Sequence, residues 1–455
     1  MQVGPHTVLD EGINRALDLM QESAAVNAIF VYSHMYHDPI SKPPRVLASD
    51  HGVPIRDQRS RKLPSIYVKH NEAPFKTTFL RHQVVDRTYE YADRDLFREL
   101  VGACRQRNIK LYARQLEDGG HTALDGISGL SRVVTRDVYG RPTTIPCWNH
   151  PDYRAFWIAT AEDLVRSYEL DGFQWGSERH GPLMNVLLLG RAPFCFCEHC
   201  LARSRDRGID CARARAGFEA LHRYVTGKPA SPAGVFGGVL RILLQYPEIL
   251  AWEYQYRLSR EEMEQAIYGA IKGVNRELPV GWHISHQQSS YDVVYRAEVT
   301  YAEMAPYSDF IKMIVYHDIL GPRIRWWYLD RLRKTIFNEV SLQASYSLYL
   351  SLFGFDPKAE PALDKLETEG FSPDYVYRET KRSVASTRGL TKIYPGIGFD
   401  VPWNSNNMPA DPEEIYQSVI KAFEAGADGI VISREYEEMR VPNLKAVGRA
   451  MRELK

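Results

Sequence analysis

The sequence has no net charge and few cysteines, and each absence argues against a class of function. Its 57 Lys and Arg residues balance its 57 Asp and Glu residues, so the formal net charge is zero. Proteins that bind nucleic acid or anionic membranes usually carry a basic excess, so neither partner is expected. Only 6 of the 455 residues are cysteine, too few for a fold held together by disulfides.

The sequence also lacks a secretion signal and a long apolar run. Its first residues, MQVGPHTVLDEGINRALDLM, contain no basic segment followed by an apolar stretch, so no signal peptide is expected. No apolar run approaches the length of a membrane span. We therefore expect a cytoplasmic protein, in which clustered cysteines are more typical of metal binding than of disulfides.

Aromatic residues are plentiful, with 8 Trp and 27 Tyr. Aromatic rings stack well on sugar rings, but a large core or a subunit interface uses them equally. The composition therefore suits a carbohydrate partner, and it leaves assembly into a homo-oligomer open.

Apolar strand-like runs alternate with amphipathic helix-like segments along the chain. This alternation is typical of a parallel sheet with crossover helices. The predicted strands are residues 2–8, 27–33, 110–114, 171–178, 279–285, 309–316, 392–400 and 428–433. Eight such strands predict a single (β/α)8 barrel domain, a TIM barrel, over residues 1–455, with long loops at 34–91 and 179–236.

Polar side chains stand at nearly every predicted strand exit. Active sites of such barrels lie at the carboxyl ends of the strands, so these residues are the candidates. They are Ser33, His34, Arg114, Glu117, Glu178, His283, His286, His317, Asp318, Asp400, Trp403, Arg434 and Glu435.

Three cysteines follow the fourth predicted strand in a C-x-C-x-x-C array. Cys195, Cys197 and Cys200 offer three thiolates, and tetrahedral zinc requires a fourth ligand. Cys147, just ahead of the preceding helix, is the best candidate for it. Cys104, Cys211 and His199 are the alternatives. A site made of four cysteines is structural, so the zinc would fasten the loop after strand four rather than activate water.

Paired carboxylates at facing strand ends would suit glycoside hydrolysis, which requires a protonated acid and an ionised partner. Glu178 follows an apolar strand containing Trp175, whose desolvating effect would raise the carboxyl pKa. Asp400 ends strand seven and Glu435 follows strand eight, so either could be the second carboxylate. Further strand-exit residues are predicted to bind the substrate: Arg114, Trp175, Trp282, His283, His286, His317, Trp403 and Arg434.

Several of these segments resemble the zinc-containing β-galactosidases of glycoside hydrolase family 42. The resembling segments are PCWNHPDYR with Cys147, the apolar strand closed by Glu178, the array CFCEHC, and GADGIVISRE near the carboxyl end. The resemblance implies a retaining glycosidase with Glu178 as acid/base, a strand-seven carboxylate as nucleophile, and a zinc site made of four cysteines.

The sequence departs from that family at three points. Ser177 precedes Glu178 where the family has Asn, and Asp400 stands where the family nucleophile is Glu. The chain also has little room for the family's additional carboxyl-terminal domains. We expect a barrel relative of the family that hydrolyses an oligosaccharide or a glycoside. The competing hypotheses are a lyase or isomerase of sugar acids, and a non-catalytic carbohydrate-binding barrel.

Overall fold

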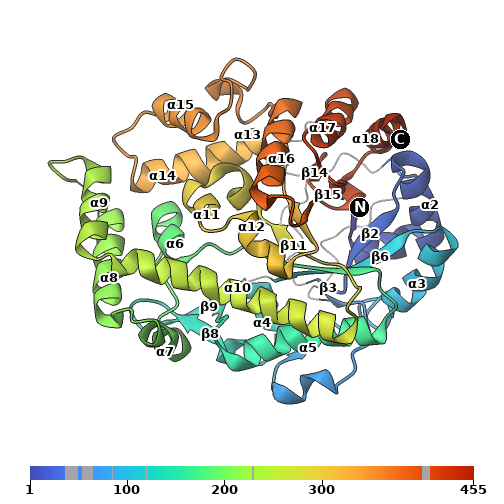
Figure 1. Ribbon diagram of the computed structural model, residues 1–455, viewed down its shortest axis with the longest axis horizontal. Helices are drawn as coiled ribbons and strands as arrows, with labels where there is room; N and C mark the ends of the chain where they lie inside the picture. Colours follow the sequence, from blue (N-terminus) through green and yellow to red (C-terminus); the bar gives the residue numbers. More distant parts are fainter. Residues whose placement is uncertain are drawn as a thin grey trace.

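The computed structural model describes residues 1–35, 50–53, 65–84, 86–117, 121–227, 230–401 and 410–454. Its centre is a curled parallel sheet of seven strands in the order β1–β2–β6–β10–β11–β12–β13, beside the parallel pair β14–β15 (Figure 1). The strands are β1 Gln2–Val3, β2 Ala28–Tyr32, β6 Lys110–Glu117, β10 Gly172–Ser177, β11 Val280–Ile284, β12 Phe310–Met313, β13 Lys392–Ile393, β14 Gly396–Gly398 and β15 Val431–Ser433. The predicted α/β fold with a parallel sheet is confirmed.

Two contacts continue the curl beyond the seven strands. A parallel bridge joins Ile314, just after β12, to Gly396 in β14. The Ser433 hydroxyl, at the end of β15, lies 2.8 Å from the side-chain amide of Gln2 in β1. The strands therefore follow the predicted order, with β13 and β14 sharing the seventh position.

Helices cover the outer face of the sheet and fill the long connections between strands. Those that alternate with the strands are α1 Pro5–Glu11, α2 Ile13–Ala24, α3 Leu96–Gln106, α5 Pro151–Ser167, α10 Glu248–Val274, α12 Tyr301–Met304, α16 Pro373–Thr387, α17 Pro412–Glu424 and α18 Val441–Glu453. The others are α4 His121–Gly126, α6 Pro182–Leu189, α7 Glu198–Asp206, α8 Cys211–Thr226, α9 Val235–Gln245, α11 Val293–Ala297, α13 Leu320–Arg323, α14 Asp330–Thr335 and α15 Leu342–Phe353.

Short strand pairs, short 3-10 turns and two π-helical turns, η4 and η6, complete the connections among the described residues. The antiparallel pairs are β3 His34–Met35 with β4 Ser65–Ile66, β5 Arg81–His82 with β7 Ile127–Ser128, and β8 Val134–Arg136 with β9 Pro142–Pro146. The turns are η2 Pro74–Thr77, η3 Leu130–Arg132, η4 Gln287–Tyr291, η5 Ala305–Tyr307, η6 Ile324–Leu329, η7 Leu363–Lys365 and η8 Tyr436–Glu438. The long connection at 179–236, predicted as a loop of the barrel, contains helices α6, α7, α8 and the start of α9.

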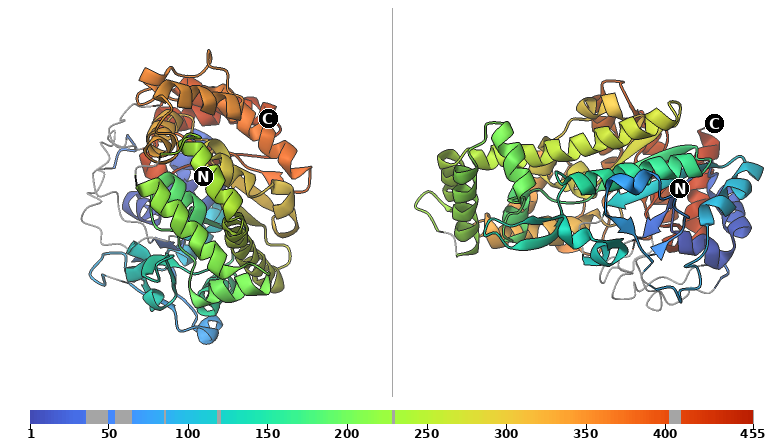
Figure 2. Two further views of the ribbon diagram at one scale, coloured as in Figure 1. Left: turned by 90° about the vertical axis from the view of Figure 1, so that its left-hand side faces the viewer. Right: turned by 90° about the horizontal axis from the view of Figure 1, so that it is seen from below.

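The outline of the molecule is elongated rather than round. Helices α8 and α9, with the near end of α10, extend from one end of it (Figures 1 and 2). At the other end, α2 and α18 pack side by side although they lie at opposite ends of the chain (Figure 1). Within the described residues, no helix has the length and apolar character needed to cross a membrane.

An aromatic layer fills the inside of the curled sheet near the amino-terminal ends of its strands. Phe30, Tyr112, Phe310 and Val431 form this buried cluster, one from each of β2, β6, β12 and β15. A Cβ atom on Gly172 would lie 2.0 Å from the Tyr112 ring, so only glycine fits beside it. Because side chains alternate along a strand, the residues two positions further on also face inward, above this layer.

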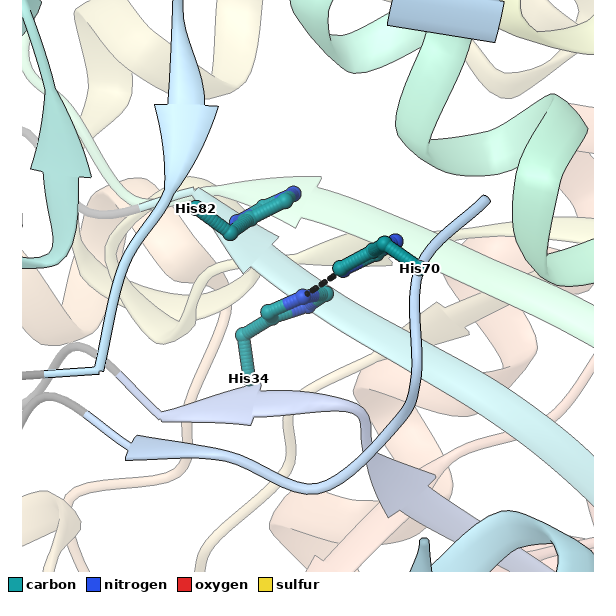
Figure 3. Close-up of side chains that lie close together, drawn as sticks. All are labelled: His34, His70 and His82. Atoms are coloured by element: carbon teal, nitrogen blue, oxygen red, sulfur yellow. Dashed lines mark hydrogen bonds between the residues drawn. The ribbon is translucent and has the colours of Figure 1, made fainter. Parts of the chain in front are cut away.

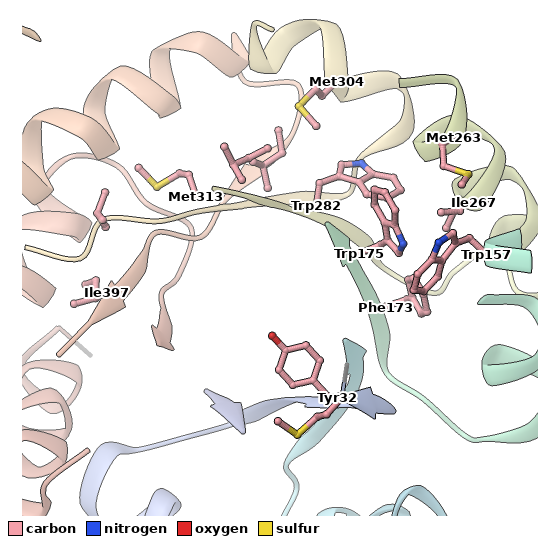
Figure 4. Packing of buried hydrophobic residues seen from close by; sticks show 14 of the residues in the cluster. Tyr32, Trp157, Phe173, Trp175, Met263, Ile267, Trp282, Met304, Met313 and Ile397 are labelled. Atoms are coloured by element: carbon pink, nitrogen blue, oxygen red, sulfur yellow. The ribbon is translucent and has the colours of Figure 1, made fainter. Parts of the chain in front are cut away.

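A second apolar layer lies outside the sheet, under the helices. Trp157 of α5, Trp175 of β10 and Trp282 of β11 pack edge to face, with ring centroids 6.1 and 6.2 Å apart (Figure 4). Trp175 and Trp282 are fully buried there. Their predicted role at the mouth of the barrel is therefore wrong, because both rings point away from the strand ends and toward the helices.

Candidate active site

Five charged or titratable side chains gather inside the sheet, at the carboxyl-terminal side of the aromatic layer. We call Arg114, Glu178, His283, Lys312 and Glu435 the central polar cluster. Arg114 stands two residues after Tyr112 and Lys312 two residues after Phe310, so the alternation of the strands turns both inward. Glu435 lies two residues beyond the end of β15, and its contact with Arg114 places it in the cluster.

A hydrogen-bonded chain joins three members of the central polar cluster. His283 Nε2 lies 2.7 Å from Glu178 Oε1, and Lys312 Nζ lies 3.4 Å from His283 Nδ1. Glycines provide the space for these side chains. A Cβ atom on Gly176 would lie 2.6 Å from the His283 Cβ, and one on Gly396 would lie 2.2 Å from the Lys312 Cε.

The remaining two members of the central polar cluster, Arg114 and Glu435, form an ion pair with each other. Arg114 NH1 lies 3.3 Å from Glu435 Oε1, and the guanidinium stacks over the Tyr32 ring at 4.2 Å. With its amide oxygen turned toward Arg114, Gln2 accepts from Nε and NH2 at 3.1 Å each. Figure 4 shows Tyr32 inside the curled sheet, on the opposite side from Trp175 and Trp282. The second Glu435 oxygen is buried and has no protein partner among the described residues.

The two carboxyl groups have opposite electrostatic surroundings. Burial acts to raise the pKa of Glu178, but the hydrogen bond and charge of His283 and the charges of Arg323 and Lys312 outweigh it and lower the pKa to about 2. The Glu178 side chain is 46% exposed, which weakens the opposing effect of burial. The expectation that its pKa is raised is therefore wrong. Burial raises the pKa of Glu435, and Arg114 offsets it only partly.

His283 and Lys312 both favour their neutral forms. Burial, followed by the Lys312 charge, lowers the pKa of His283 to about 3. The ring is then neutral, donates Nε2–H to Glu178 and accepts at Nδ1 from Lys312. Lys312 is fully buried, and burial and the nearby Arg114 charge hold its pKa well below the usual range for lysine.

Lys312 is not among the residues predicted from the sequence, although its position in an apolar strand could have indicated it. The strand DFIKMIVY is apolar except for this lysine and its first residue. A lysine within an otherwise apolar strand is costly to bury and is therefore a candidate functional residue. Tyr32, Tyr316 and Arg323, which surround the cluster, were missed as well.

The other predicted binding residues have varied positions. His286 accepts at Nδ1 from Arg323 NH1 at 2.8 Å and lies 2.9 Å from the Tyr375 hydroxyl, so it borders the cluster through Arg323. Arg434 forms an ion pair with Glu438 at 3.1 Å. His317 is fully buried, and burial alone lowers its pKa to about 4, so it is apart from the cluster's charges. Trp403 lies outside the described residues.

Asp400 has a structural position instead of a catalytic one. Its carboxylate accepts from the Arg440 backbone N–H at 2.9 Å, from Asn443 Nδ2 at 2.7 Å and from the Ala410 N–H at 3.2 Å, and it pairs with the Arg440 guanidinium at 3.2 Å. These contacts hold the start of α18. The prediction of Asp400 as second carboxylate is thus disfavoured, and its alternative, Glu435, lies in the central polar cluster.

Three of the four predicted cysteine ligands, Cys147, Cys197 and Cys200, are close together in the structure. Cys147 Sγ lies 3.5 Å from Cys200 Sγ and 3.4 Å from Cys197 Sγ, and all six cysteines are free thiols. Cys195 is also buried, and burial raises the pKa of its thiol to about 11. Sulfur atoms around tetrahedral zinc are about 3.8 Å apart, given Zn–S bonds of about 2.3 Å. The spacing of these three sulfur atoms is compatible with three of the four ligands of a zinc site. The alternative ligand Cys211 instead contacts the carbonyls of Leu201 and Ile209.

The fold is one that glycoside hydrolases share. The glycoside hydrolase domain of PgaB (BpsB) from Bordetella bronchiseptica aligns over 95% of this chain and 93% of its own, with a TM-score of 0.52 and 13% identity. No protein-family model matches the chain, and no curated protein sequence does.

Two β-galactosidases have the same fold and agree with the family resemblance seen in the sequence. The enzyme from the Antarctic haloarchaeon Halorubrum lacusprofundi has a TM-score of 0.53 and 12% identity, over 99% of this chain. The enzyme from Marinomonas ef1 has a TM-score of 0.51 and 10% identity, over 100% of this chain. This chain spans 57% and 59% of their respective lengths. At such identities the likeness establishes the fold alone.

Proposed function

We propose that this protein hydrolyses a glycosidic bond on a closed, zinc-stapled (β/α)8 barrel, with Glu178 and Glu435 as its two catalytic carboxyl groups. The observation that carries the proposal is their common surroundings. Both charges act on Arg114 and on Lys312, although the two residues follow strands β10 and β15, far apart in the chain. Paired carboxyl groups on facing sides of the site are what this reaction requires.

The electrostatics favour a division of roles. Glu178 is the ionised member in the substrate-free protein, suited to act as nucleophile or as base for a water molecule. Glu435 has the raised pKa and is suited to donate the proton. This reverses the acid/base role that the family resemblance implies for Glu178. Arg114, His283, His286 and Arg434 would orient the sugar.

Hydrolysis of a panel of aryl glycosides by the parent, Glu178→Gln, Glu435→Gln and the exposed control Glu413→Gln tests this function. We expect turnover of at least one glycoside by the parent and the control, and a loss of at least about a hundredfold in both site variants. Turnover that either site variant retains in full would remove that residue from the mechanism.

Azide addition to the alanine variants distinguishes the roles. If Glu178 is the nucleophile of a retaining enzyme, azide restores activity in Glu178→Ala and gives a glycosyl azide of inverted configuration. Activity toward glycosides with good leaving groups would persist in Glu435→Ala, because they need no proton donor. A product of retained configuration from Glu178→Ala would restore the acid/base role that the resemblance implies.

Lys312 supports a second candidate, a lyase acting on a sugar acid or another carbonyl substrate. A buried lysine with a depressed pKa is a nucleophile that condenses with a carbonyl group to form an imine and water. Arg114 and Arg323 would bind a substrate carboxylate. Borohydride in the presence of a panel of 2-keto sugar acids would then leave a reduced adduct on Lys312, visible by mass spectrometry and absent in Lys312→Met. No adduct with any member would exclude this candidate.

A further inference from the structure

Three histidines from the long connection after β2 form a second cluster, apart from the central polar cluster. His34 lies in β3, His70 lies in the loop before η2, and His82 lies in β5 (Figure 3). One ligand nitrogen from each ring lies within 4.8 Å of those of the others. The Nε2 atoms of His34 and His70 are 2.6 Å apart.

In the His70 and His82 rings, the nitrogen that is not proposed as a ligand has a protein partner that can accept its proton. His70 Nδ1 contacts the buried Asp163 carboxylate of α5 at 2.5 Å. His82 Nε2 lies 2.8 Å from the Thr160 hydroxyl, which donates its own hydrogen to the Phe156 carbonyl and therefore accepts from His82.

The same holds for the third ring. His34 Nδ1 lies 2.8 Å from the Ser33 hydroxyl, which can accept its proton, and 3.3 Å from the side-chain nitrogen of Gln115, which also donates to the Ser33 hydroxyl. In the zinc-bound form the protons would be on His34 Nδ1, His70 Nδ1 and His82 Nε2, which leaves the lone pairs of His34 Nε2, His70 Nε2 and His82 Nδ1 for the metal. Without the metal, one of the two Nε2 atoms that lie 2.6 Å apart carries the proton that they share. A carboxylate or hydroxyl that fixes the tautomer in this way is the usual surrounding of metal-binding histidines.

We propose that His34, His70 and His82 bind a zinc ion through one nitrogen each, with Asp163 orienting His70 and a water molecule as the fourth ligand. Three neutral imidazoles suit zinc, and hard cations such as Mg²⁺ and Ca²⁺ would prefer oxygen ligands. Burial keeps His34 and His82 neutral by holding their pKa values well below the usual range.

Zinc binding would require the rings to separate and turn, because a metal lies in the plane of each imidazole that binds it. Nitrogens around tetrahedral zinc are about 3.3 Å apart, given bonds of about 2.0–2.1 Å, so His34 and His70 would separate by about 0.7 Å. The three rings are nearly parallel, with interplanar angles of 8 to 15°. They would turn about the Cβ–Cγ bond, a torsion that is soft for histidine.

Such a site would fasten the long connection between β2 and α3 to the body of the protein. Its ligands come from three separate places in that connection, and two of them contact α5 through Asp163 and Thr160. The predicted thiolate site joins other segments, so the two metals would be bound independently.

Metal content and cobalt spectroscopy test the proposal on the full chain. We expect the chelator-treated parent, reloaded with Zn²⁺, to bind one equivalent more than its thiolate site accounts for. With Co²⁺, the thiolate charge-transfer band gives the number of sulfur-bound metals. His70→Ala should lose one equivalent and leave that band unchanged, while the surface control His222→Ala should lose none.

Asp163→Asn retains all three ligands and should weaken zinc binding at this site by about 10- to 100-fold. Total metal in the parent equal to the thiolate-bound metal would overturn the proposal, and this comparison requires no variant to fold. An unchanged zinc stoichiometry in a folded His70→Ala would overturn it as well. Neither result depends on whether the protein hydrolyses a glycoside.

Discussion

Asp400 and Glu435 both follow a strand, yet their carboxyl groups have different surroundings. Asp400 is enclosed by donors from Ala410, Arg440 and Asn443, whereas Glu435 has one ion pair with Arg114 and one oxygen without a protein partner among the described residues. A carboxylate whose hydrogen-bonding capacity is already used stabilises the fold. One with a free, buried oxygen is available to a substrate.

Asp400→Asn should therefore lower the stability of the protein and leave its catalytic activity unchanged. The variant loses charge-assisted hydrogen bonds to Arg440, each worth about 1.5–3 kcal/mol. We expect a lower thermal midpoint with little change in the turnover of any glycoside that the parent hydrolyses. A folded Asp400→Asn that has lost turnover while Glu435→Gln retains it would return Asp400 to the role predicted from the sequence.

Trp175→Ala tests the corrected position of that side chain. Removing a fully buried tryptophan ring from a core typically costs about 3–5 kcal/mol. We expect this loss in urea unfolding, together with a substrate KM close to that of the parent. A large rise in KM in a variant of nearly normal stability would instead place Trp175 in a sugar subsite.

Much of the fold and part of the candidate site could be predicted from the sequence. Strand order, the cysteine cluster and Glu178 follow from pattern and spacing alone. The error at Trp175 is one of strand alternation. Gly172 and Gly176 face inward, so Trp175, which has the opposite parity in the strand, faces the helices. No local signal could show that the Asp400 carboxylate turns toward Arg440 and Asn443, because those partners are 40 and 43 residues away in the chain.

At the scale of elements, the carboxyl groups of Glu253, Asp292 and Glu298 lie in surroundings that disfavour their charged forms. Glu253 of α10 accepts from the Leu183 N–H at 2.7 Å, at the start of α6, and Asp292 caps α11. Burial raises the pKa values of Glu253 and Asp292 to about 7 and raises that of Glu298 well above its usual range. The folded state therefore favours the protonated carboxyl groups.

This arrangement makes stability depend on pH. A carboxyl group with a folded pKa near 7 and an unfolded pKa of about 4 contributes its full stability below pH 4 and loses it as pH rises through 7. Glu253→Gln cannot ionise and can still accept from Leu183. We expect its thermal midpoint, relative to the parent, to be higher at pH 8 than at pH 5. An equal difference at both values would show that Glu253 does not titrate in this range.

At the scale of the whole molecule, the segments near the two ends of the chain contact each other. His6 Nε2 lies 3.0 Å from Glu437 Oε1, and the Thr7 hydroxyl donates to Glu437 Oε2 at 2.7 Å. These contacts join α1 to η8, alongside the approach of β1 and β15. The described tryptophans lie elsewhere, between residues 148 and 327.

Glu437→Ala should consequently destabilise the protein as one unit. It leaves buried donors on α1 without their acceptor, at a cost of about 1–3 kcal/mol. If residues 1–455 form a single domain, as the sequence predicts, the loss must spread to the distant tryptophans. Urea unfolding curves from tryptophan fluorescence and from far-UV circular dichroism should then coincide and shift together. The exposed Glu413→Gln should shift neither by more than about 0.5 kcal/mol. The contrary result is an unchanged fluorescence transition together with a circular dichroism curve that shows two transitions. It would mean that the segments around α1 and η8 unfold separately from the part of the chain that contains the described tryptophans.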